Sequence, residues 1–298
     1  SGYEGSAYQA IHPESFPNDP FMSITRPMMW SLLYLVVRLV GELWLDDRLT
    51  IVVFAGITAV TLVGLDQTVK LFGARQAGER AAMLALMLLG HQILMNGGAL
   101  VTHLEFASAT FAGPVNLWLL YASLAGRSPR LVLPLMFLSP LVAVKQAAMP
   151  VLIALIFLWR DRLGPRGKGI AAVVAGATVV LSLAAYYGFF RPPDDSHARL
   201  FDFRLRQDEA ESNPFWNPLI NNLQFLALCL GGLLIRGLHP SLVARVRIIA
   251  GLGLAVWLLG GVYLSFAPDA LKIPYVGAFN VSRMLWWTQY VLFVAIGV

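Results

Sequence analysis

Charged residues are scarce in this 298-residue chain, and their scarcity limits the class of protein. Only 13% of the residues are charged, whereas 57% are hydrophobic. An average soluble domain carries about 25% charged residues, and a soluble core of this size could not enclose so much apolar surface. The composition therefore predicts a membrane protein in which lipid surrounds much of the chain.

The sequence also lacks several residues and motifs, and each absence excludes a class of site. Cysteine occurs once, at Cys229, so no disulfide can form within the chain. No His/Cys cluster has zinc-ligand spacing, and neither a P-loop nor a G-x-S-x-G nucleophile motif occurs. Basic residues are not interleaved with aromatic ones, which argues against nucleic acid as a partner. Because an initiator Met, a signal peptide and a closing polar tail are also missing, we expect a fragment that lacks both ends.

Apolar runs make up most of what is present, and they predict an all-α fold. We expect a single domain, a polytopic transmembrane helical bundle with an interfacial helix and outer loops. Residues 1–48 are predicted as a first outer loop with its interfacial helix, 49–189 and 223–298 as membrane helices, and 190–222 as another outer loop. The individual spans are predicted at 49–71, 81–96, 111–126, 131–159, 169–189, 223–238, 248–266 and 284–298.

The connections between these runs differ in charge. One set has twelve bases and three acids, a net charge of +9; the rest of the chain has ten bases and fourteen acids, a net charge of −4. The bases of the first set are Lys70, Arg75, Arg80, Arg127, Arg130, Arg160, Arg162, Arg166, Lys168, Arg236, Arg245 and Arg247. Since cytoplasmic connections are enriched in Lys and Arg, this set is predicted to face the cytoplasm and the acidic loops the outside.

This assignment bears on the apolar stretch 131–159, which would be about 43 Å long as one helix. A single crossing would put the basic turn at 160–162 on the outer side. Pro134, Pro140 and Pro150 interrupt the stretch, so we predict two short helices with Lys145 near an outer apex. A broken helix at membrane depth needs protein or a water-filled cavity around it, which suggests a cavity open to the outside.

The first outer loop carries His12, Glu14 and Asp19 among several prolines. A restricted backbone can hold a carboxylate in place for proton abstraction or metal binding. Alternatively, Asp19 starts a turn or caps the following helix. The second outer loop, 97–110, places His103 two residues before Glu105; these side chains are either functional or simply solvated at the interface.

Two basic residues on the outer side are candidates for holding an anion. Lys145 is flanked by apolar residues, and such a lysine is costly unless it is paired or functional; the alternative is that it reaches the interface along its alkyl chain. Arg283 stands before the pair Trp286 and Trp287 at the start of the last span. Its guanidinium group suits bidentate contact with phosphate, or it contacts lipid phosphates non-specifically.

Taken together, these features resemble the GT-C class of integral-membrane glycosyltransferases. The resemblance lies in an acidic first outer loop (His12-Pro13-Glu14 and Phe16-Pro17-Asn18-Asp19), an interfacial helix after it, an acid in the second outer loop and a late arginine. The chain looks most like a poorly characterised bacterial branch whose first loop reads close to "FPND". It departs from better-known members because it lacks a paired Asp-Asp or Asp-Glu in that loop.

The resemblance implies an enzyme of the bacterial inner membrane that moves a sugar from a polyprenyl-phosphate donor to an acceptor on the periplasmic face. Asp19, with Glu14 and Glu105, would be catalytic, and a divalent metal ion is a candidate cofactor. His12, His103, Lys145 and Arg283 would contact the substrate, Lys145 on account of its location rather than a family motif. The alternative is a transporter or lipid flippase, which the broken stretch 131–159 favours.

Overall fold

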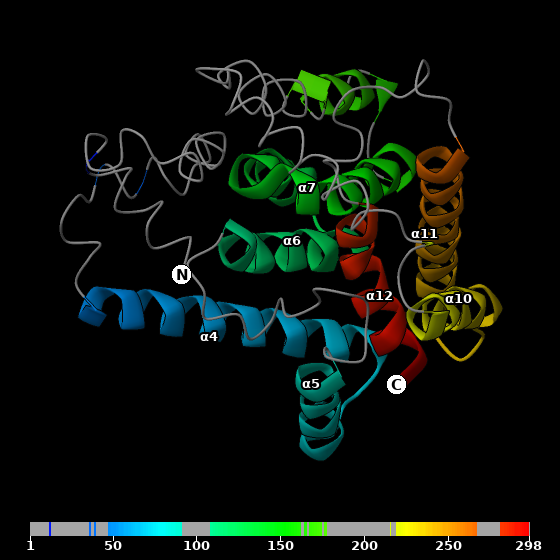
Figure 1. Ribbon diagram of the computed structural model, residues 1–298, viewed down its shortest axis with the longest axis horizontal. Helices are drawn as coiled ribbons and strands as arrows, with labels where there is room; N and C mark the ends of the chain where they lie inside the picture. Colours follow the sequence, from blue (N-terminus) through cyan, green and yellow to red (C-terminus); the bar gives the residue numbers. More distant parts are fainter. Residues whose placement is uncertain are drawn as a thin grey trace.

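In the computed structural model of the protein (Figure 1), every described element is a helix. The structure describes His12, Val36, Leu39, Phe215 and residues 47–90, 108–161, 164–165, 167–174, 176–177, 219–266 and 281–297. The main helices are α4 (Asp47–Phe72), α5 (Ala77–Gly90), α6 (Ser108–Leu124), α7 (Pro129–Asp161), α10 (Leu219–Leu234), α11 (Pro240–Phe266) and α12 (Val281–Gly297). The expectation of an all-α fold is therefore met over these residues.

The turns between helices follow from local chemistry. Gly73 and Gly126 have φ values of 121° and 61° after α4 and α6, a left-handed conformation that glycine adopts without a Cβ penalty. α7 and α11 begin at proline, whose missing N–H is not needed in the first turn. The Glu79 carboxylate accepts hydrogen bonds from the backbone N–H groups of Arg75 and Gln76, which stabilises the start of α5.

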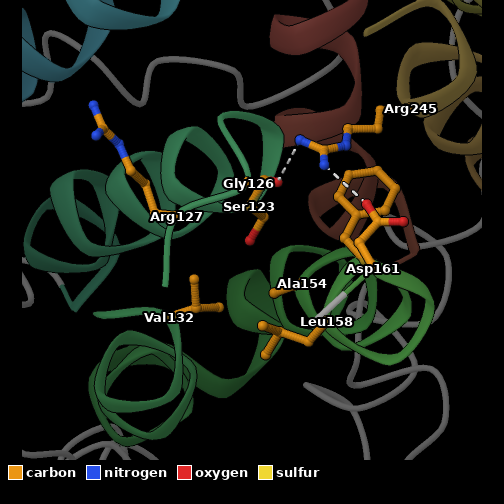
Figure 2. A pocket seen from close by; sticks show the side chains of 9 residues that line it. Ser123, Gly126, Arg127, Val132, Ala154, Leu158, Asp161 and Arg245 are labelled. Carbon is orange, nitrogen blue, oxygen red and sulfur yellow. Dashed lines mark hydrogen bonds and ion pairs between the residues drawn. The ribbon is translucent and has the colours of Figure 1, made fainter. Parts of the chain in front are cut away.

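α7 is broken, as the charge pattern predicts. Ala143 has extended backbone angles (φ −155°, ψ 97°) inside the helix. Val132 before the break and Leu158 after it line the same small hollow (Figure 2), although 26 positions of straight helix would put them about 39 Å apart. The two arms of α7 therefore fold back along one another, and Lys145 lies two residues after the break.

Contacts between neighbours fix the direction of each helix. α4 and α6 run in parallel, because Phe54 contacts Phe111 and Trp118 donates to the carbonyl of Val60. α10 runs antiparallel to α11, since a Cβ on Gly232 would meet Ala250 and one on Gly253 would meet Phe225. The final residues of α12 lie beside α5, as the contact between Gly297 and Met83 shows.

As a result, the described basic residues of the +9 set gather at one end of the helices, which we call the basic end. It comprises the ends of α4, α6 and α10, both ends of α7, and the starts of α5 and α11. Its bases are Lys70, Arg75, Arg80, Arg127, Arg130, Arg160, Lys168, Arg236, Arg245 and Arg247. The arginines at 162 and 166 lie outside the described residues.

Two described helices are long and apolar enough to cross a membrane: Ile51–Phe72 in α4 and Pro240–Phe266, which is α11. Only 22% of each apolar window is buried. In Figure 1, α4 runs along the long axis, whereas α5 and α11 run across it. The described helices therefore do not all run in one direction, and the polytopic transmembrane bundle stays a prediction.

Several helix boundaries differ from the predicted spans. α10 begins and ends four residues earlier than the predicted 223–238, and α11 begins eight residues before 248. The difference at α11 arises because Arg245 and Arg247, which hydropathy excludes from a span, lie in a helical turn that extends past the apolar segment. Of the predicted interfacial helix, only Val36 and Leu39 are described; both are helical and exposed.

α12 lies at the centre of the main core. Residues 285–292 are all buried, so the helix is enclosed around its whole circumference over this stretch. It packs against residues of α4, α6, α7, α10 and α11 in one hydrophobic cluster, in which Trp287 and Phe225 are the largest fully buried side chains. A second cluster joins α6 to both arms of α7.

Candidate functional site

The residues predicted from the outer loops fall mostly beyond the described part of the chain. Asp19, Glu14, Glu105 and His103 lie outside the described residues. His12 is described and is partly buried, with an interaction of its own. The catalytic roles of the three carboxylates therefore stay predictions.

Lys145 and Arg283 are placed by their backbone alone, since their side chains lie outside the described residues. Lys145 follows the break in α7, and Arg283 lies in the first turn of α12. α12 ends at the basic end and both arms of α7 have their outer termini there, so Lys145 and Arg283 belong to helix segments away from that end. Both were predicted on the outer side, and that placement stays a prediction.

The described hollow lies at the basic end (Figure 2). It has a volume of about 210 Å³, part of it open to solvent. Its lining comes from Ser123, Gly126, Arg127, Val132, Ala154, Phe157, Leu158, Asp161 and Arg245. Only about 10 Å³ of this space admits the centre of a water-sized sphere, which is room for about one water molecule, so the hollow is too small for a lipid-linked sugar.

Arg245 joins three helix ends inside this hollow. Its Nη1 donates to the carbonyl oxygens of Ser123, at 3.3 Å, and of Leu124, while its Nη2 donates to Asp161 Oδ2 at 2.8 Å. The guanidinium carbon also lies 5.6 Å from the centre of the Phe157 ring. Carbonyls at a helix C-terminus lack intrahelical donors and carry partial negative charge, so a cation there stabilises α6.

Asp161 is the acid of this cluster, and both of its oxygens are used. Oδ1 accepts a hydrogen bond from Arg160 Nε at 2.6 Å, and Oδ2 accepts from Arg245. Partial burial raises the pKa of Asp161, but the hydrogen bonds from Arg160 and Arg245 outweigh that effect and hold the pKa below its ordinary value. The carboxylate therefore stays ionised at neutral pH and acts as a structural ion that links Arg160 and Arg245.

Arg127, on the turn between α6 and α7, is exposed and differs from Arg245 in its partners. Its Nη2 donates to the Tyr121 hydroxyl at 3.1 Å, and its guanidinium carbon lies 5.8 Å from the centre of the Tyr121 ring. The hydrogen bond to Tyr121 raises the pKa of Arg127 further.

The divalent metal expected from the resemblance finds no ligand set among the described residues, where no three His, Cys, Asp or Glu side chains gather. The sequence also did not single out Arg245 and Asp161 as partners. The available signal was that Asp161 is the one acid in the basic turn at 160–162. No family model, curated protein or solved structure matches the chain significantly.

Proposed function

We propose that this chain is a multi-pass protein of the bacterial inner membrane, a GT-C-like glycosyltransferase that moves a sugar from a polyprenyl-phosphate donor to an acceptor on the periplasmic face. The proposed membrane location rests on one observation, which is that large apolar side chains are exposed along the two long helices α4 and α11. Ile51 and Val52 on α4 are 66% and 67% exposed, and Leu259 and Phe266 on α11 are 69% and 74% exposed. Apolar surface of this extent is stabilised by lipid and not by water.

The proposed orientation of the protein in the membrane follows from the distribution of charge. The basic end carries the positive connections, and cytoplasmic surfaces are enriched in Lys and Arg. The acidic first loop, with Asp19, and the second, with Glu105, are then periplasmic. A transferase that uses a lipid-linked donor needs an acid and a phosphate-holding cation on the same side, which these loops, Lys145 and Arg283 supply.

The proposed chemistry assigns one role to each kind of residue. An ionised Asp19 accepts the proton of an acceptor hydroxyl as its oxygen bonds to the anomeric carbon of the sugar. The bond from that carbon to the donor phosphate breaks, and the phosphate leaves with the electron pair. Lys145 and Arg283 stabilise the phosphate charge, an effect that a low-dielectric surrounding strengthens.

The test compares two Asp→Asn variants of the full-length protein in a sugar-transfer assay with a polyprenyl-phosphate donor. Asp19→Asn is expected to lower turnover by a factor of about 100 or more, the scale of general-base catalysis. Asp161→Asn, which removes a carboxylate at the basic end, is the matched control and is expected to keep turnover near the wild-type value. Wild-type turnover by Asp19→Asn would remove Asp19 from the mechanism.

A transporter or lipid flippase is the second candidate, and the break at Ala143 is the observation that favours it. Transporters place their substrate sites on discontinuous helices near the bilayer midplane. Because the arms of α7 fold back along one another, however, the break lies at the tip of a helical hairpin and not halfway along a span. Counterflow of a labelled lipid-linked sugar in liposomes, without covalent change, would favour the transporter.

A further inference from the structure

The turn between α6 and α7 and the end of α7 form a cluster of bases at the surface of the basic end. Arg127 and Arg130 lie on either side of the start of α7, and Arg160 lies at its end. All three are exposed. Asp161, Arg127 and Arg245 line one hollow, which brings these two connections together (Figure 2).

The acid in this cluster does not neutralise the exposed arginines on the turn. Asp161 is bound by Arg160 and Arg245. Arg127 has the neutral Tyr121 hydroxyl as its partner, and no ion pair to Arg130 occurs among the described residues. Two guanidinium groups three residues apart are thus left for an anion that is not part of the described chain.

Exposed apolar side chains adjoin two arginines of the cluster in the sequence: Leu131 follows Arg130, and Trp159 precedes Arg160, all on α7. Leu131 is 48% exposed and Trp159 is 45% exposed, at the two ends of the folded α7. The ammonium group of Lys168 lies 5.6 Å from the centre of the Trp159 ring. Exposed tryptophan beside bases is typical of the boundary between lipid headgroups and acyl chains. A free phosphate ion has no apolar group that could contact Leu131 or Trp159, whereas a phospholipid has its acyl chains.

We propose that this surface is a binding site for an anionic glycerophospholipid. Arg127 and Arg130 bind the headgroup phosphate, and Leu131 and Trp159 contact the acyl chains. The site is distinct from the one proposed for the lipid-linked sugar, because it lies at the basic end. It rests on the membrane location proposed above and not on sugar transfer, so a chain without transferase activity would still have it.

The experiment measures lipid retained by the full-length protein after detergent extraction, by native mass spectrometry, with phosphatidylglycerol and phosphatidylcholine as probes. Wild type is expected to retain phosphatidylglycerol preferentially. Since one base near an anionic surface changes affinity about fivefold, the double variant Arg127→Gln/Arg130→Gln should lose that preference by a factor of about 25. The conservative pair Arg127→Lys/Arg130→Lys should keep most of it.

Arg75→Gln is the matched control, because Arg75 is an exposed arginine of the basic end on a different turn, between α4 and α5. It should keep the preference within about twofold. An equal melting temperature of the double variant and wild type in phosphatidylcholine would show that folding is intact. Undiminished phosphatidylglycerol retention by the double variant, or an equal loss in Arg75→Gln, would overturn the proposal.

A second readout places the acyl chains. Phosphatidylglycerol with brominated chains is expected to quench tryptophan fluorescence in the wild type more than in Trp159→Phe, because bromine quenches only at short range. Equal quenching in both proteins would contradict contact between Trp159 and the lipid.

Discussion

Among the described residues of the basic end, Arg245 is expected to contribute most to the stability of the fold. Its side chain is 11% exposed, and it contacts both the C-terminal carbonyls of α6 and Asp161. Arg245→Gln is expected to lower the free energy of unfolding by about 2 kcal/mol, since it leaves several partly buried acceptors without a charged donor. Arg247→Gln, two residues further along α11 and exposed, should cost less than about 0.5 kcal/mol. Thermal unfolding in detergent checks both, and equal losses would contradict the assignment.

Asp161 should make stability depend on acid pH. Because its pKa is lowered in the folded protein, its contribution is fully present above the ordinary Asp pKa of about 3.9 and is lost as the pH falls through the lowered value. The melting temperature of wild type should therefore exceed that of Asp161→Asn at pH 7, and the difference should shrink below about pH 4. A difference that stays constant down to pH 2.5 would contradict this role.

At the scale of residues, the ion pair between Asp161 and Arg245 could not be predicted from the sequence. The charge pattern predicted that both belong to connections on one side. It could not select this pair from twelve bases and three acids, because the two lie in different helices and meet only through the packing of α6, α7 and α11. Arg127 was likewise counted as a charge, without its Tyr121 partner.

At the scale of elements, the fold of α7 can be measured directly. Leu131 and Trp159 are both exposed and therefore suit spin labels, in a background where the buried Cys229 is replaced by Ala. A straight helix would separate them by about 42 Å, whereas the folded-back arms should give less than about half of that distance. Pulsed electron paramagnetic resonance checks it, and a peak near 42 Å would exclude the break at Ala143.

The glycines of α11 provide a second test. A Cβ on Gly253 would lie 2.6 Å from Cγ2 of Thr288 on α12, whereas one on Gly251 would meet nothing within 4 Å. Gly253→Ala is therefore expected to destabilise the protein by about 1–3 kcal/mol through overpacking. Gly251→Ala should stabilise it by about 0.5–1 kcal/mol because glycine is unfavourable in a helix. Chemical denaturation of both variants checks the difference in sign.

Element types were more predictable than element ends. Apolar runs located α4, α6 and α12, and the alternation of charge predicted that 131–159 is broken. The break falls at Ala143, three residues after Pro140, and the proline pattern alone does not predict that position. The starts of α10 and α11 were misplaced, since hydropathy does not register polar turns that continue a helix.

At the scale of the whole molecule, the central prediction is that the basic end and the first loop face opposite sides of the membrane. In a Cys229→Ala background, a cysteine at Asn18 should react with an impermeant thiol reagent added to bacterial spheroplasts. A cysteine at Ser128, which is exposed on the turn between α6 and α7, should react only after permeabilisation. Reaction of both cysteines from the same side would refute the topology and the proposed reaction with it.

The enclosure of α12 also has a consequence for biosynthesis. α12 is the last described helix to leave the ribosome, yet residues 285–292 are surrounded by helices that are made before it. Until α12 is made, the hydrophobic cluster that includes Phe225 and Leu120 lacks Trp287, its largest fully buried side chain. Packing of the described core is thus completed only after α12 has been made, and a chain truncated before Val281 would lack the helix that fills it.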